Sequence, residues 1–257
     1  MDQSSIFILT RGEGPPVLFV HGNPDSSDIW TPLIDRLPGY RCVALDLPGF
    51  GRTNVPDNFH FSLPELADFI ERAVNQANIT EPVHLVVHDF GGPFGFAWAV
   101  SHPEKVRSIC VMNTTFFSDY RWHRWAKVWR TPILGEISMA TMNWPLFMKT
   151  MRQSLKNVSD AHIRKTYDAI TPQMKKTVLK LYRATDPENF KGWEDRLLAL
   201  TARVPTLVLW GDRDPYISPR FAERFGATKV VHFAQTGHWL MLEHPDEVAT
   251  EIKNFLK

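Results

Sequence analysis

Short runs of aliphatic and β-branched residues alternate along the chain with stretches in which apolar residues recur at helical spacing. The apolar runs lie at residues 17–20, 41–46, 83–88, 106–113, 205–210 and 228–233. Turn-forming segments follow the first three of them, namely HGNP, LPGFGR and DFGG. Hydrophobic strands that alternate with helices are typical of a mostly parallel central sheet flanked by helices on both faces. The pattern therefore predicts an α/β fold.

Two helices of this fold have clear sequence signals. Residues 62–74 form an amphipathic stretch that starts at Ser62, a candidate N-cap, with Glu65 three residues later at the spacing of a capping box. Residues 244–257 have helical spacing and close the chain.

Residues 114–201 differ in pattern from the rest of the chain. Their apolar residues recur at helical spacing with little strand pattern, and Trp, Met and Phe are frequent. We interpret this segment as a helical lid, or cap, inserted in a core made of residues 1–113 and 202–257. Within the predicted helix 121–130, Trp122, Trp125 and Trp129 recur at i, i+3 and i+7. A membrane-binding helix has this pattern, but we favour a lid helix that packs its tryptophans inward.

Composition and charge narrow the class of protein. The chain has 257 residues, 44% of them hydrophobic, and its 29 Lys and Arg residues nearly balance 28 Asp and Glu residues. This balance gives no electrostatic reason to expect a nucleic acid or a membrane as partner, so we expect a small molecule. Cys42 and Cys110 each lie in an apolar stretch and are predicted to be buried free thiols. The first residues lack the features of a signal peptide, and we expect a cytoplasmic monomer or homodimer.

Asp89 occupies an unusual position in the stretch LVVHDFGGPFGF. A strand, then x-x-Asp-x-Gly, then the small residues Gly91 and Gly92 match a nucleophile elbow, with Val87 where the first glycine usually lies. Asp214 in GDRDP and His238 in TGHW follow the two later strands. Each of the three residues alone also fits a cap, a turn or a loop, but together they form the chain order of a nucleophile, an acid and a histidine. No metal site, phosphate loop or other cofactor site is apparent.

The motifs HGNP, DLPGFGR, VHDFGG, GDRDP and GHW resemble those of α/β-hydrolases with an aspartate nucleophile, which are the epoxide hydrolases and haloalkane dehalogenases. The resemblance implies the α/β-hydrolase fold and an alkyl-enzyme ester on Asp89, because a carboxylate is ionised at neutral pH and can displace a leaving group from an sp³ carbon. His238, oriented by Asp214, would activate the water that hydrolyses the ester. The backbone N–H groups of Phe90 and Asn23 would stabilise the oxyanion.

Two leaving groups fit these motifs, an epoxide oxygen and a halide. Asn23 after HG resembles the halide-binding asparagine of the dehalogenases, but Phe90 replaces their second donor, a tryptophan, and has no side-chain N–H. Epoxide opening needs an acid, and LKLYRATD resembles the late-lid segment of epoxide hydrolases and nominates Tyr182. Tyr120 is the candidate for the early-lid donor, with His123 second. Fluoroacetate dehalogenases share the late-lid Tyr-Arg but have an arginine where this chain has Phe90.

The sequence therefore predicts epoxide hydrolysis to a diol, with haloalkane dehalogenation as the alternative and a non-catalytic small-ligand receptor as a further reading that the triad argues against. The expected reactants are water and a small apolar molecule, with no cofactor. The expected pocket residues are His123, Trp144, Phe147 and Trp239.

Overall fold

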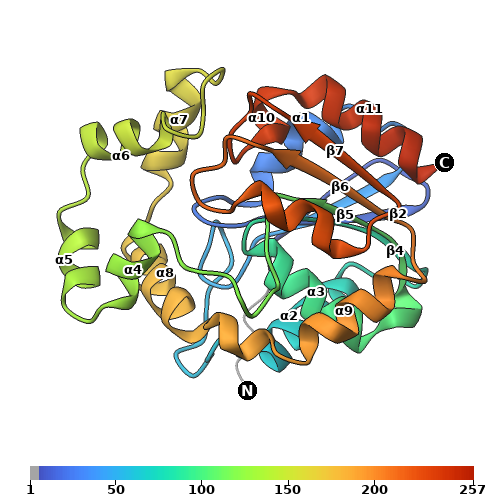
Figure 1. The fold of residues 1–257 in the computed structure, drawn as a ribbon, viewed down its shortest axis with the longest axis horizontal. Coiled ribbons are helices and arrows are strands. Elements are labelled where there is room, and N and C mark those ends of the chain that lie inside the picture. The colour runs from blue at the N-terminus through green and yellow to red at the C-terminus, as the bar shows by residue number, and fades with distance from the viewer. Residues whose placement is uncertain (1–5) are drawn as a thin grey trace.

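The computed structural model describes residues 6–257, and a seven-stranded sheet forms its centre (Figure 1). The strands are β1 (Ile8–Arg11), β2 (Pro16–Val20), β3 (Arg41–Leu45), β4 (Val83–His88), β5 (Val106–Met112), β6 (Thr206–Gly211) and β7 (Lys229–Phe233). They lie in the order β1-β3-β2-β4-β5-β6-β7, and all neighbours are parallel except β1 and β3. The predicted α/β fold is confirmed. The expectation about a signal peptide concerns the first residues, of which 1–5 lie outside the described part.

Alternating side chains of the strands build a core on each face of the sheet. In β2, Leu18 and Val20 belong to one buried cluster, whereas Val17 and Phe19 belong to the other, and none of the four is exposed. This alternation follows from the two-residue period of a strand and explains why a strand buried on both faces is apolar throughout.

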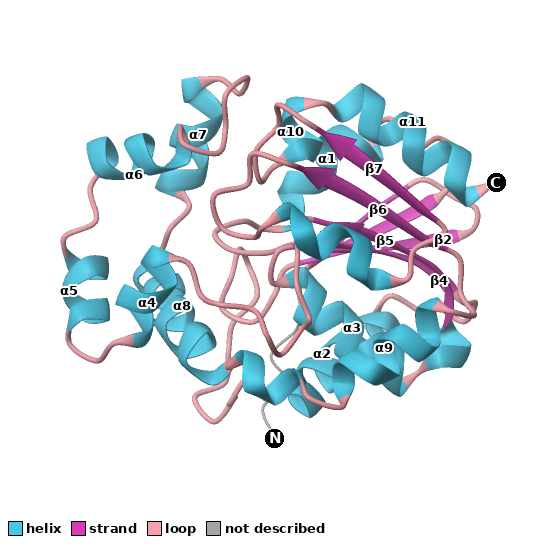
Figure 2. Cartoon of the chain, in the orientation of Figure 1, coloured by secondary structure: helices cyan, strands magenta, loops and turns pink. Residues whose placement is uncertain are grey.

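Helices cover both faces of the sheet (Figure 2). One layer consists of α2 (Leu63–Gln76), α3 (Gly91–Ser101) and α9 (Trp193–Thr201), and the other consists of α1 (Thr31–Ile34), α10 (Leu240–Glu243) and α11 (Pro245–Leu256). Short 3-10 helices lie at Ser27–Trp30, Pro103–Lys105, Pro187–Phe190 and Pro219–Phe225. Helix α2 starts after Ser62 as predicted, and the Glu65 carboxylate accepts a hydrogen bond from the Ser62 backbone N–H at 3.1 Å.

The helices of the lid are α4 (Arg124–Arg130), α5 (Leu134–Ala140), α6 (Trp144–Met151), α7 (Asp160–Asp168) and α8 (Pro172–Ala184). They lie beyond the carboxyl ends of the strands, on the left of Figure 1. The sequence assigned residues 114–201 to the lid, but α9 packs on α3 and so lies with the core helices. The sequence predicts Trp122, Trp125 and Trp129 on one face of a helix. This prediction is wrong for Trp122, which precedes α4.

Both cysteines match their prediction, because Cys42 and Cys110 are buried free thiols. Burial raises the pKa of the Cys42 thiol to about 12, so this residue stays protonated. Across residues 6–257, no helix combines the length and the apolar composition that crossing a bilayer requires.

Candidate active site

Asp89 lies in a sharp turn between β4 and α3, with a backbone φ of +49°. Glycines on both sides of the turn allow the neighbouring backbone to approach closely. A Cβ at Gly91 would lie 2.0 Å from the Val20 carbonyl oxygen, and a Cβ at Gly22 would lie 2.4 Å from the Asp89 Cβ. The Thr114 hydroxyl donates to the Asp89 carbonyl at 2.5 Å. The turn thus has the tight backbone approach that the sequence predicts for a nucleophile elbow.

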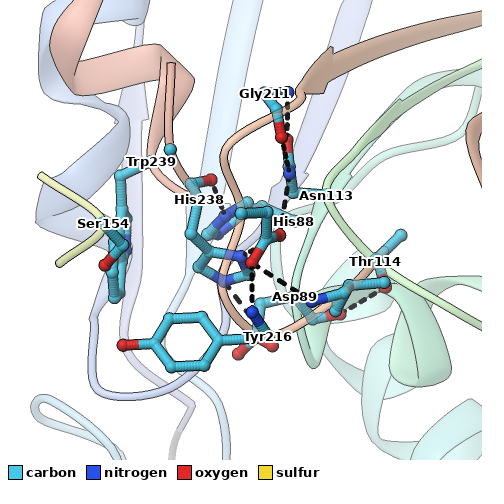
Figure 3. A network of polar contacts seen from close by, with 12 residues as sticks. His88, Asp89, Asn113, Thr114, Ser154, Gly211, Tyr216, His238 and Trp239 are labelled. Atoms are coloured by element: carbon cyan, nitrogen blue, oxygen red, sulfur yellow. Dashed lines mark hydrogen bonds and ion pairs between the residues drawn. The ribbon is translucent and has the colours of Figure 1, made fainter. Parts of the chain in front are cut away.

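Asp89, Asp214 and His238 come together at the carboxyl edge of the sheet (Figure 3). His238 Nδ1 hydrogen-bonds to Asp214 Oδ2 at 2.7 Å, and His238 Nε2 lies 3.8 Å from Asp89 Oδ1. The other oxygen of Asp214 accepts the backbone N–H groups of Tyr216 at 2.7 Å and Ile217 at 3.1 Å. One carboxylate therefore orients the imidazole, while the second nitrogen of the ring faces Asp89.

Asn113 connects the end of β5 to the same carboxylate. Its Nδ2 donates to Asp214 Oδ2 at 2.8 Å and to the Gly211 carbonyl at 3.1 Å, and its Oδ1 accepts the Gly211 N–H at 2.8 Å. From sequence, Asn113 stands where some dehalogenases carry their acid as a glutamate, which left Asp214 as the acid, and we assigned Asn113 no role of its own. Its position directly after a strand at the predicted site edge is the signal that could have nominated it.

His88, at the end of β4, contacts His238, the candidate catalytic histidine. Its Nε2 donates to the His238 carbonyl at 2.9 Å, and the two ring centroids lie 4.5 Å apart. Complete burial lowers the pKa of His88 well below its usual value, so its ring stays neutral. The bond fixes the backbone of His238 relative to β4, a role that the sequence analysis did not identify.

The charges in this site are coupled. Burial raises the pKa of Asp89, while His238 and the backbone N–H groups of Asn23 and Phe90 counteract that rise. Burial alone would lower the pKa of His238, but Asp214 and Asp89 outweigh it and raise the pKa above its usual value. The surrounding carboxylates therefore favour a positive charge on the imidazole.

The predicted oxyanion donors lie beside Asp89. The Asn23 backbone N–H donates to Asp89 Oδ2 at 2.8 Å, and the backbone N–H of Phe90, the next residue in the chain, also counteracts the rise in the pKa of this carboxylate. The Phe90 side chain packs against the ring of Tyr182 in a T-shaped arrangement, with ring centroids 4.7 Å apart. Both N–H groups thus lie where charge would develop on an ester of Asp89.

A cavity between the lid and the core opens onto Asp89 and His238. Of the residues predicted from sequence, Asn23, His123, Phe147, Tyr182 and Trp239 line it. Trp144 does not, and its ring packs instead on Tyr167, with centroids 5.6 Å apart, and under Arg164. The rest of the wall is mainly apolar, with Trp125, Trp129, Met139, Met142, Met151, Met174 and Val178 among its residues. The cavity therefore suits an apolar molecule.

Tyr120, the predicted early-lid donor, does not line the main cavity, whereas Tyr216 does. Tyr120 lies outside the main cavity and lines only a small void beside Asp89, and its hydroxyl donates to the Tyr216 carbonyl at 3.2 Å. Tyr216, which the sequence analysis missed, lines the main cavity near His238 (Figure 3). Its place directly after GDRDP was the available signal. His123 lines the cavity with its Nδ1 accepting the Ala126 N–H at 3.3 Å.

Tyr182 and Asn23 both line the cavity with Asp89. Burial first and the charge of Asp89 second raise the pKa of Tyr182 well above its usual value, and the Asn23 side chain opposes this rise. Tyr182 therefore stays protonated at neutral pH. Its hydroxyl can donate this proton to an acceptor in the cavity.

Residues 15–245 match the family model described as alpha/beta hydrolase fold. The chain belongs to this family. The strand order, the nucleophile elbow and the chain order of the triad also indicate an α/β-hydrolase. This chain order is Asp89, Asp214, His238.

Characterised relatives of this α/β-hydrolase carry several activities. A cis-3-alkyl-4-alkyloxetan-2-one decarboxylase of Shewanella oneidensis is 27% identical over 98% of this chain and 85% of its own length. A haloalkane dehalogenase of Mesorhizobium japonicum is 28% identical over 100% of this chain and 89% of its own length. Epoxide hydrolase 3 of Xenopus tropicalis is 26% identical over 95% of this chain and 71% of its own length. The chain is thus an enzyme, a hydrolase of the haloalkane dehalogenase and epoxide hydrolase family.

Solved structures with the same fold come from both groups. An ancestral haloalkane dehalogenase superposes with a TM-score of 0.82 at 23% identity, covering 99% of this chain and 96% of its own. An epoxide hydrolase of Vigna radiata superposes with a TM-score of 0.80 at 21% identity, covering 99% and 95%. At these identities the likeness concerns the α/β-hydrolase fold alone.

Proposed function

We propose that the chain hydrolyses epoxides to diols through an ester between the substrate and Asp89. The observation that carries the proposal is that Tyr182 lines the cavity together with Asp89 and keeps its proton at neutral pH. Its hydroxyl can therefore give this proton to the substrate. An oxygen leaving group needs such a proton, whereas a halide leaves without one.

The first step joins the substrate to the enzyme. One oxygen of the Asp89 carboxylate attacks a ring carbon as the carbon–oxygen bond breaks, and Tyr182 gives its proton to the ring oxygen. A neutral alkyl ester and a tyrosinate remain. Displacement at carbon proceeds from the side opposite the leaving group, so the ring oxygen must face away from Asp89, toward the tyrosine.

The second step hydrolyses the ester. His238 Nε2 takes a proton from water, and the hydroxide adds to the ester carbonyl carbon while the oxyanion accepts the N–H groups of Asn23 and Phe90. The alkoxide then leaves with the proton from His238. The Asp89 carboxylic acid returns its proton to the Tyr182 oxygen, which restores both groups.

Halide departure has weaker support in this site. Phe90 brings no side-chain donor. Trp239, the tryptophan nearest to His238 with ring centroids 4.7 Å apart, donates its indole N–H to Asp25 at 2.8 Å and is therefore occupied.

The test compares products and two variants. Purified protein receives a styrene-type epoxide, a bromoalkane and a 3-alkyl-4-alkyloxetan-2-one, with diol, bromide and carbon dioxide as readouts. We expect diol release, and Tyr182→Phe should lower the rate of alkylation by about 10² to 10⁴ because it removes the general acid. Tyr167→Phe is the matched control, since this lid tyrosine does not line the cavity.

Asn23→Ala separates the two leaving groups. For an epoxide it should cost less than Tyr182→Phe, because the phenol keeps its proton. Efficient bromide release that survives Tyr182→Phe and fails in Asn23→Ala would make the chain a dehalogenase. Carbon dioxide release without diol would replace the proposal by a decarboxylation.

A further inference from the structure

The lid carries an exposed aliphatic surface. Five large hydrophobic side chains are strongly exposed within residues 6–257, and four of them, which we name the lid tip, are Ile133 at 73%, Leu134 at 53%, Ile137 at 52% and Leu146 at 41%. They lie on and before α5 and on α6, at the outer edge of the lid in Figure 1. The fifth, Leu198, lies on the core helix α9.

The backbone presents this surface at a cost. Ile133 has a φ of +71°, a conformation that β-branched residues rarely adopt, and it directly precedes α5. A polar residue or glycine would meet the demands of an exposed turn better than isoleucine. An exposed, strained isoleucine is consistent with a surface that becomes covered.

Positive charge surrounds the lid tip. Residues 121–156 hold seven of the 29 Lys and Arg residues but one of the 28 Asp and Glu residues, so this segment has six excess positive charges and the rest of the chain has five excess negative charges. Arg124, Lys127 and Lys149 are exposed and form no ion pair within the described part of the chain. The single acid, Glu136, is neutralised by Arg183 at 2.8 Å.

The surface is continuous with the active-site cavity. Leu146 belongs to the lid tip and also lines the cavity. A shallow hollow next to it runs between Arg124 and Lys149 and shares His123 and Trp125 with the cavity wall. An apolar molecule at the lid tip therefore lies next to the wall of the catalytic cavity.

The positive charge and the aliphatic side chains of the lid tip together indicate which kind of partner binds this surface. A second copy of the chain placed lid to lid would bring two positively charged segments together, which opposes association. A nucleic acid would match the charge but not the four aliphatic side chains. An anionic bilayer matches both, because its headgroups attract Lys and Arg and its acyl region accepts aliphatic side chains.

We propose that the lid tip docks on the surface of an anionic membrane, with Ile133, Leu134 and Ile137 entering the acyl boundary and Arg124, Lys127 and Lys149 contacting the headgroups. The part of the cavity wall at Leu146 then faces the membrane, and an apolar substrate can enter from there. This inference departs from the sequence-based expectation of no membrane partner, because the sequence shows neither the exposure of the aliphatic residues nor which cations lack a partner. It does not depend on the leaving group.

The experiment is co-sedimentation of the full chain with vesicles. We expect binding to phosphatidylcholine vesicles that contain phosphatidylglycerol, weaker binding in high salt, and little binding to phosphatidylcholine alone. Lys127→Glu should weaken the affinity at least about fivefold, and Ile133→Ser combined with Ile137→Ser should abolish binding. Leu198→Ser and Arg203→Glu are the matched controls on and after α9 and should bind like the unmodified chain.

The variants are checked by thermal unfolding and by turnover of a water-soluble substrate, both of which should be unchanged because the substituted residues do not line the cavity. Absence of wild-type binding to anionic vesicles would overturn the proposal, as would equal loss of binding in the α9 controls. A dimer in light scattering that Ile137→Ser dissociates would assign the lid tip to a second copy instead.

Discussion

Replacing Asp214 by asparagine tests the two-step mechanism most sharply. Asp214 Oδ1 accepts two backbone N–H groups, from Tyr216 and Ile217, while Oδ2 faces His238 Nδ1 at 2.7 Å and the Asn113 amide at 2.8 Å. In Asp214→Asn the amide oxygen must take the Oδ1 position, since an NH₂ group cannot accept those two bonds. The NH₂ group then turns to His238.

This exchange changes the proton on the imidazole. The new NH₂ group donates to Nδ1, so the ring proton moves to Nε2, which can no longer accept a proton from water. The same exchange in a serine protease costs about 10⁴ in kcat, and we expect a loss of that order in ester hydrolysis here. Attack by the Asp89 carboxylate needs no base, so the ester should accumulate.

Intact-protein mass spectrometry after rapid quenching measures the ester directly. Asp214→Asn should gain the full mass of the epoxide within one turnover and release diol slowly. Asp212→Asn is the matched control, because this neighbouring carboxylate bonds to His232 at 2.6 Å and does not contact His238. Steady-state diol release within tenfold of the unmodified enzyme, or slow turnover without any covalent adduct, would refute the mechanism.

Two further predictions concern carboxylates. Asp89→Asn should abolish turnover while the midpoint of thermal unfolding stays within a few degrees, because the amide is nearly isosteric but cannot attack carbon; full activity, once deamidation is excluded by mass spectrometry, would contradict this. Burial raises the pKa of Asp25 to about 7, so its proton stabilises the fold at low pH and that stability is lost as the pH rises to 7. Asp25→Asn, which can still accept the Trp239 N–H, should therefore increase the free energy of unfolding by up to about 4 kcal/mol at pH 8 and by much less at pH 4. Urea unfolding at both pH values measures the difference, and an equal effect at both would contradict a raised pKa of Asp25 in the folded protein.

The sequence predicted most of the sheet because strands that are buried on both faces are continuous apolar runs. It did not predict β1, whose four residues are half-buried or exposed and pair with β3 only at the edge of the sheet. Pairing at an edge needs little hydrophobic signal, so a short strand of this kind has no clear pattern.

The candidate triad could be read from sequence because each member follows a strand, and the carboxyl ends of parallel strands meet at one edge. The place of Tyr120 could not be predicted. Its hydroxyl bonds to a carbonyl 96 residues later in the chain, a contact that depends on how the lid loop meets the loop after β6. Tyr182 was found because it lies in a motif, whereas Tyr216 directly follows the motif of Asp214 and was overlooked.

The packing around the elbow has a consequence for stereochemistry. Gly22 and Gly91 pack so closely that no space remains on their side of Asp89, since a single added carbon at either position would overlap a neighbouring atom. A substrate therefore reaches the carboxylate from the side of the cavity, where lid residues form most of the wall and contribute to the choice of carbon and enantiomer. The helices α4 to α8 form one continuous stretch of the chain. Exchanging this stretch between related enzymes should therefore also transfer the handedness of the product.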